Sequence, residues 1–181
     1  MNPFVFLIDI IFQLYATALL IRLLLQWVRA DFYNPVSQFI VKMTNPPVMP
    51  LRKIIPGYGG IDMATLLLAI TVMAVKIIII YQVPDPFFIS MMTLSQTLVL
   101  IVSIFLYSII IQAILSWVNP DPYNPIVSLL NSITHPVLKH FRALVPPISG
   151  FDISSIFAII ALMFVQYSIQ YIFTGIIDSA L

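Results

Sequence analysis

Four apolar stretches alternate with more polar segments along the chain. They cover residues 4–28, 62–81, 94–118 and 153–173. A helix needs about 20 residues to cross a hydrocarbon core of about 30 Å. Lipid offers no partner to an unpaired amide, so helices are expected despite β-branched runs such as Ile77–Ile80. The pattern therefore predicts four transmembrane helices.

Composition supports a membrane protein. The 181 residues are 61% hydrophobic and 8% charged, whereas a soluble domain is about half apolar and a quarter charged. We expect the lipid bilayer to be the main partner. Net charge is +1 without a clustered basic surface, so no direct nucleic-acid partner is expected. Cysteine is absent, which excludes disulfides and thiolate metal sites, and we expect no cofactor.

The distribution of basic residues predicts the orientation. Lys and Arg are concentrated in the segments after the first and third apolar stretches, and cytoplasmic loops carry such an excess. Both long loops are therefore expected in the cytoplasm, with both termini in the periplasm. No Lys or Arg precedes Arg22, so the first stretch is expected to be retained rather than cleaved as a signal peptide. The loop residues are Arg29, Lys42, Arg52, Lys53, Lys139 and Arg142.

The two halves of the chain repeat each other at a constant offset of 90 residues. From residue 27 to residue 62, 12 of 36 positions are identical to those 90 residues later, including Trp, Asp, Arg and Gly. We therefore expect two units, residues 1–90 and 91–181. Two spans per unit make the copies parallel rather than inverted. The sequence thus predicts an all-α membrane protein built from two parallel helix–loop–helix repeats.

The matched residues lie mostly in the two long loops. Each loop begins with the pattern D-x-Y-N-P, in which Asn before Pro favours a turn and a helix cap. An amphipathic stretch follows, then a Thr-x-Pro that should break it, then a second short stretch carrying an arginine. A Gly-x-Asp leads into the next span, where the Asp is expected to cap the helix. These loop helices are expected to be interfacial or re-entrant.

The loop pattern resembles that of the YggT family, also called YlmG-like. Its mark is D-x-x-N-P followed by T-x-P-x-x-x-P-x-R-x-x-x-P-x-x-x-G-x-D. Repeat one carries the whole pattern, whereas repeat two has His140 where Pro50 stands. The resemblance implies an inner-membrane protein linked to osmotic-stress tolerance and envelope maintenance. Relatives are linked to division-site or nucleoid organisation and, in plastids, to haem attachment to cytochrome b6.

The matched loop positions are candidates for binding a partner or lipid, or for structuring the loop. For the two arginines, three readings are open: binding of a lipid headgroup or a partner's carboxylate, a positive-inside anchor, or a bond to an Asp of the same loop. The candidates are Asp31, Asn34, Pro35, Thr44, Pro46, Arg52, Gly60 and Asp62 in repeat one, and Asp121, Asn124, Pro125, Thr134, Pro136, Arg142, Gly150 and Asp152 in repeat two.

Three charges fall well inside the spans of repeat one, away from the Asp that begins the second span. Asp9 and Lys76 are expected at similar depth, and their repeat-two counterparts, Val99 and Gln166, are both uncharged. An intramembrane ion pair is one interpretation, and separate snorkelling to the outer headgroups is the other. Arg22 lies near the inner end of the first span and is expected to reach toward lipid phosphate rather than to line a pathway.

The residues favour no enzyme. No phosphate-binding glycine loop, catalytic triad or paired carboxylates are present, and His135 and His140 are expected to be solvated or interfacial rather than haem or metal ligands. The favoured function is a non-enzymatic factor that organises or assembles membrane components. The alternatives are a small channel or transporter and a haem or cytochrome assembly factor. Other membrane proteins, anionic lipids and further copies of the chain are candidate partners.

Overall fold

The computed structural model describes residues 2–118, 124–144 and 152–180. The regular secondary structure of this part of the chain is entirely helical, and the connecting segments hold one isolated bridge between Tyr58 and Ile61, which confirms the all-α prediction. Four of its helices are long and apolar enough to cross a membrane, so the chain is a multi-pass membrane protein. The helices are α1 (Pro3–Trp27), α2 (Pro35–Arg52), α3 (Met63–Tyr81), α4 (Pro86–Val118), α5 (Pro125–Leu144) and α6 (Ser154–Ala180).

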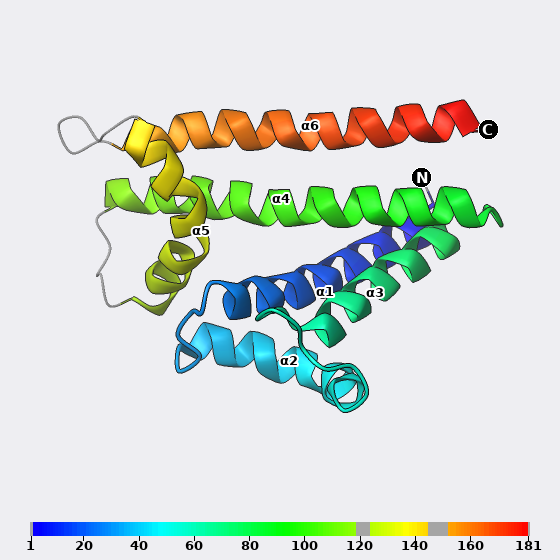
Figure 1. The fold of residues 1–181 in the computed structure, drawn as a ribbon, viewed down its shortest axis with the longest axis horizontal. Coiled ribbons are helices and arrows are strands. Elements are labelled where there is room, and N and C mark those ends of the chain that lie inside the picture. The colour runs from blue at the N-terminus through cyan, green and yellow to red at the C-terminus, as the bar shows by residue number, and fades with distance from the viewer. Residues whose placement is uncertain (1, 119–123, 145–151, 181) are drawn as a thin grey trace.

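Each repeat contributes one antiparallel pair of long helices. Helix α1 packs along α3, α4 packs along α6, and the two pairs meet where α3 packs against α4. Figure 1 shows α2 and α5 at one end of the bundle and both ends of the chain at the opposite end. The two loop helices, α2 and α5, therefore lie on the same side of the bundle, as parallel repeats require.

The expected spans differ from the helices at two ends. Helix α4 begins at Pro86, eight residues before the predicted start at 94, and α6 continues to Ala180 rather than ending at 173. The early start has a clear cause, because the carboxylate of Asp85 accepts hydrogen bonds from the backbone N–H groups of Phe87 and Phe88, both at 3.1 Å. Asp followed by Pro is a helix-start signal that the hydropathy pattern alone does not reveal. The division at residue 90 falls inside α4.

The predicted break at Thr-x-Pro is wrong. Helix α2 runs through Pro46, Pro47 and Pro50, and α5 runs through Pro136. A proline inside a helix removes one N–H and crowds the preceding turn, which bends a helix without necessarily ending it. Figure 1 shows α5 changing direction part-way along its length. Each loop thus carries one bent helix rather than two short ones.

The predicted caps are present. The side-chain oxygen of Asn34 accepts from the N–H of Val36 at 2.9 Å, and that of Asn124 accepts from the N–H of Ile126 at 2.9 Å. Pro35 and Pro125 then open α2 and α5, since a proline in the first turn loses no hydrogen bond. Asp62 caps α3 through the N–H of Thr65. The matched Asn-Pro residues, and Asp62 of repeat one, thus begin helices.

A dry layer lies in the middle of the α1–α3 pair. Ala16, Leu19 and Leu20 from α1 and Ala69 and Met73 from α3 are fully buried. Polar residues lie on either side of this layer: Asp9 and Gln13 precede it along α1, and Arg22 and Gln26 follow it. The helix pair therefore has two separate polar regions, one near the chain termini and one near α2.

Candidate functional site

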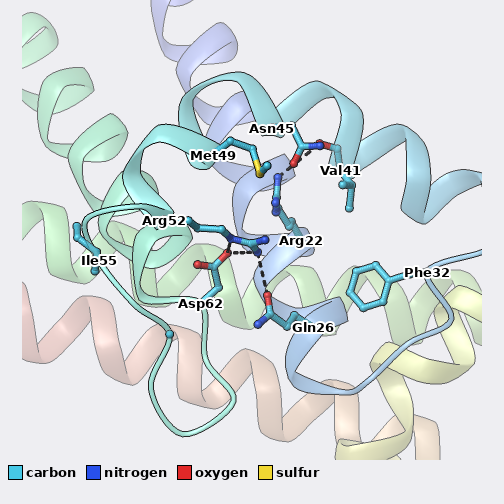
Figure 2. Close-up of a pocket in the computed structure, with 10 residues that line it drawn as sticks. Arg22, Gln26, Phe32, Val41, Asn45, Met49, Arg52, Ile55 and Asp62 are labelled. Carbon is cyan, nitrogen blue, oxygen red and sulfur yellow. Dashed lines mark hydrogen bonds and ion pairs between the residues drawn. The ribbon is translucent and has the colours of Figure 1, made fainter.

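A cavity of about 700 Å³ with both polar and apolar side chains in its lining opens between the loop end of α1, the helix α2 and the segment leading into α3. Figure 2 shows that side chains from all three of these segments enclose it. The polar residues of the lining include two of the matched positions, Arg52 and Asp62. The lining residues are Arg22, Gln26, Phe32, Val41, Asn45, Met49, Arg52, Ile55, Gly57 and Asp62.

Arg52 and Asp62 form an ion pair at this cavity. The Arg52 Nε donates to Asp62 Oδ2 at 2.9 Å, and its Nη2 donates to the same oxygen. Nη2 also donates to Gln26 Oε1 at 3.2 Å, while the Thr65 hydroxyl donates to Asp62. The pair ties the end of α2 to the start of α3 and to the end of α1. We call the Arg52–Asp62 pair and its repeat-two counterpart the clasps.

Repeat two has a clasp at the matched positions. Arg142 donates to Asp152 Oδ2 from Nε at 2.8 Å and from Nη2 at 2.6 Å, and the Ser154 hydroxyl donates to the same carboxylate. The second clasp is more open, because the Asp152 side chain is 26% exposed, whereas that of Asp62 is 3% exposed. Of the readings open from sequence, the structure places both arginines on an Asp of their own loop.

Both clasp carboxylates have pKa values below the usual value for Asp. Burial raises the pKa of Asp62, but hydrogen bonds from Arg52 and Thr65 and the positive charge of Arg52 outweigh that effect. Burial also raises the pKa of Asp152, and hydrogen bonds from Ser154 and Arg142 with the charge of Arg142 outweigh it. The folded protein therefore holds both groups in the charged form more strongly than the unfolded chain does.

The lowered pKa values of Asp62 and Asp152 predict that acid destabilises the folded protein. An unfolded Asp has a pKa of about 3.9, so the clasps contribute their full stability above about pH 4 and lose it as the pH falls through the lowered native values. In detergent, the thermal midpoint should drop between about pH 4 and pH 2. The double variant Asp62→Asn/Asp152→Asn should begin lower and drop less. If the thermal midpoints of the variant and the natural chain fell equally as the pH was lowered, the prediction would be contradicted.

The matched threonines join each loop helix to a span, a role that sequence reasoning missed. Arg22 Nη1 donates to Thr44 Oγ1 at 2.8 Å, while in repeat two the Thr134 hydroxyl donates to the Gln112 side chain. Gln112 is the residue 90 positions after Arg22. The sequence predicts that Arg22 snorkels toward lipid phosphate, whereas the structure shows its side chain buried against α2 rather than extended along the surface of the bundle. The signal available in the sequence was that Arg22 and Thr44 each have a counterpart 90 residues later, at Gln112 and Thr134.

The remaining matched positions shape the turns. Asp31 Oδ1 accepts from the N–H of Tyr33 at 2.8 Å, so this carboxylate caps a turn instead of meeting Arg52. Gly60 has a φ of 83°, which strains any residue with a Cβ, and it closes the hairpin turn just before Asp62. Asn34 Nδ2 donates to the carbonyl of Pro125 at 2.6 Å, which links the two repeats. Asp121 and Gly150 lie outside the described residues.

A second polar cluster lies near the terminal end of the bundle. Lys76 Nζ is 3.1 Å from Asp9 Oδ1 and donates to Gln13 Oε1 at 2.9 Å. The two charges therefore meet rather than diverge to the headgroups. At the matched positions of repeat two, Gln166 Nε2 donates to Ser103 Oγ at 3.2 Å. The two long helices of each repeat are thus bridged at matched positions. The bridge is charged in repeat one and uncharged in repeat two.

The two histidines do not converge. His135 and His140 are both exposed on α5, and a spacing of five residues puts them about 140° apart around a helix. The ring Nδ1 of His140 donates to the Pro136 carbonyl at 2.8 Å. Among the described residues there is no group of three His, Cys, Asp or Glu side chains that could hold a metal ion.

Comparisons with known proteins agree with the repeated fold. The chain is 44% identical over 169 residues to an uncharacterized protein of Pseudomonas aeruginosa, covering 90% of this chain and 85% of the relative. It is 35% identical over 172 residues to the uncharacterized protein YggT of Escherichia coli K12, covering 93% and 90%. An uncharacterized Vibrio alginolyticus protein shares 36% over 176 residues, covering 92% and 93%.

No solved structure matches the chain. The model of one family, described as CCB3/YggT, matches it twice, over residues 1–83 and 91–173. These two matches follow the 90-residue repeat and contain both clasps. The chain is therefore a two-repeat member of the CCB3/YggT family.

Proposed function

We propose that this protein is a non-enzymatic scaffold of the inner membrane that organises or assembles other membrane proteins. In this proposal α2 and α5 lie at the cytoplasmic surface, as the basic loop residues favour, and both termini are periplasmic. Residues 1–90 and 91–181 act as two copies of one unit. The proposal extends to osmotic stress, where the assembled components would support tolerance.

The observation that carries the proposal is that the matched loop residues hold α2 and α5 in fixed positions. The clasps, the caps and the buried threonines all build and fix the position of α2 and α5. The link from Asn34 to the Pro125 carbonyl joins the two helices into one surface. On that surface the side chains of Phe39 and Ile126 remain largely exposed. A fixed surface with exposed apolar groups suits the binding of a protein partner.

The charged groups of repeat one give the transport alternative its support. Asp9, Gln13, Lys76 and Gln96 line a cavity of about 540 Å³, and Arg22 lines the other cavity. The fully buried apolar layer around Leu19, Leu20 and Met73 separates the two along the helices. In addition, the Asp9 and Lys76 charges neutralise each other. This arrangement favours a structural role for the pair over an aqueous path for ions.

The scaffold proposal predicts position-specific cross-linking in intact cells. A photoreactive residue in place of Phe39 on α2 should capture a defined membrane protein. A matched probe in place of Phe164, an exposed residue of the long helix α6, should capture lipid instead. In cells lacking the chain, the complex containing the captured protein should fall in amount, and cells should grow less well at high osmolarity. The natural chain should restore both.

Two results would contradict the scaffold role. One is an unchanged amount of the captured complex in cells that lack the chain. The other is solute-selective flux through liposomes containing the purified protein, abolished by Lys76→Met but retained by Gln166→Met at the matched uncharged position. That second result would establish transport as the function.

A further inference from the structure

Arg22 is a buried guanidinium with only neutral partners in the described part of the chain. It is 3% exposed, and its Nη1 donates to Thr44 Oγ1 at 2.8 Å and to the Val41 carbonyl at 3.4 Å. No described carboxylate lies within 4.0 Å of it. Asp62, the carboxylate of the cavity, is already held by Arg52 and Thr65. A buried charge without a counter-charge is costly, so an anion at this position would be stabilising.

The space for such an anion is present. Arg22 and Arg52 line the same cavity of about 700 Å³, and Figure 2 shows both guanidinium groups inside it. The lining carries these two positive charges against one carboxylate. A guanidinium has five N–H donors in a planar fork, and Nη1 is the one atom of Arg22 that bonds to a described residue. The cavity therefore combines net positive charge with unused donors.

The cavity also lies at the depth of a lipid headgroup. Helix α1 has 25 residues, a length of about 37 Å, against a hydrocarbon core of about 30 Å. Arg22 lies five residues before the end of α1 at Trp27, which is about 7 Å along the axis. That distance places its head near the boundary between hydrocarbon and headgroups, where phosphate is the abundant anion.

Repeat two shows that the charge is not needed for the fold. There the matched residue is Gln112, which accepts a hydrogen bond from Thr134 and donates to Asn131 Oδ1 at 2.7 Å. A neutral side chain thus makes the same link between span and loop helix. The positive charge of Arg22 has no counterpart at the matched position of repeat two. We therefore expect the charge to serve the binding of an anion rather than the stability of the fold.

We propose that this cavity binds a phosphate group, with Arg22 as the buried donor and Arg52 at the rim. The phosphate belongs to an anionic phospholipid or to free phosphate, since the guanidinium fork fits the oxygens of either. The phosphate site does not depend on the scaffold role. It also explains why repeat one, unlike repeat two, has a buried arginine behind its clasp.

The test uses the purified protein in a zwitterionic detergent. Dioctanoyl phosphatidylglycerol, or inorganic phosphate with chloride at matched ionic strength, is titrated while the thermal midpoint is recorded. The midpoint of the natural chain should rise with the ligand, because binding to the folded state alone is stabilising. Arg22→Gln, which copies repeat two, should remain folded and bind about tenfold more weakly or worse. Lys139→Gln, an exposed loop charge on α5, is the matched control and should respond like the natural chain.

The two ligands separate the sources of the phosphate. A rise with phosphatidylglycerol alone assigns the site to lipid, and a rise with inorganic phosphate that Arg22→Gln removes assigns it to the free anion. The proposal is overturned if neither ligand shifts the natural chain. It is also overturned if folded Arg22→Gln and the natural chain respond equally, since the binding would then not involve Arg22.

Discussion

Replacing Asp9 by Lys is expected to lower the free energy of unfolding in detergent by about 2–3 kcal/mol. Two ammonium groups would then face each other where Lys76 Nζ now lies 3.1 Å from a carboxylate. Breaking a buried pair costs about 3–5 kcal/mol. The Asp9 side chain is 39% exposed, so water and headgroups relieve part of that cost. Lys76→Asp should be at least as damaging, because Lys76 is nearly buried.

The double reversal, Asp9→Lys with Lys76→Asp, is the critical measurement. It restores opposite charges at the same two positions, so it should regain about half or more of the stability lost by the worse single variant. Gln166→Asp, which places the carboxylate at the matched position of repeat two, is the control and should not rescue Asp9→Lys. If the double variant has no higher free energy of unfolding than the less stable of the two single variants, the pairing has no energetic importance.

The second large effect is expected for Asp62→Ala, which should lower the free energy of unfolding by about 2–4 kcal/mol. The change removes the cap of α3, which contributes about 1 kcal/mol, and leaves Arg52 without its carboxylate. Because Arg52 is 38% exposed, water can solvate part of the abandoned charge, which keeps the loss below that of a fully buried pair. Urea or thermal unfolding in detergent, followed by near-ultraviolet circular dichroism, would measure it.

Two comparisons divide that loss into its parts. Asp62→Asn keeps a capping oxygen and removes the charge, so it should be less damaging than Asp62→Ala. Asp152→Ala breaks the more exposed clasp of repeat two and should cost less than Asp62→Ala. Equal losses for Asp62→Ala and Asp152→Ala would show that burial of the carboxylate is not what makes the first clasp important.

The spans and the helix starts, apart from the start of α4, could be predicted because they depend on local sequence. An apolar run of bilayer length must be helical in lipid, and Asn34 or Asp62 caps the residues that follow it directly. The parallel arrangement of the loops followed from counting spans in each repeat. These inferences needed no knowledge of which helices pack together.

Contacts between distant residues could be predicted only where the sequence marked both partners. The charges of Asp9 and Lys76 drew attention because charges are rare in spans, and matched Arg and Asp residues suggested a clasp. Arg22 was marked as a charge in a span and Thr44 as a matched loop position, but no local pattern paired them, since their hydrogen bond depends on how α2 lies across the end of α1. The course of α2 through three prolines also depends on packing, which outweighs the local preference to end a helix.

The unequal lengths of α3 and α4 have a consequence for the surrounding bilayer. Helix α3 has 19 residues and α4 has 33, which correspond to about 28 Å and about 50 Å along their axes. These neighbours cannot both match one hydrocarbon thickness without tilt or protrusion. Lipid beside α3 would be compressed relative to lipid beside the long helix. Each molecule would thus create a small gradient in membrane thickness, and chain length of the host lipid would influence how it sorts and clusters.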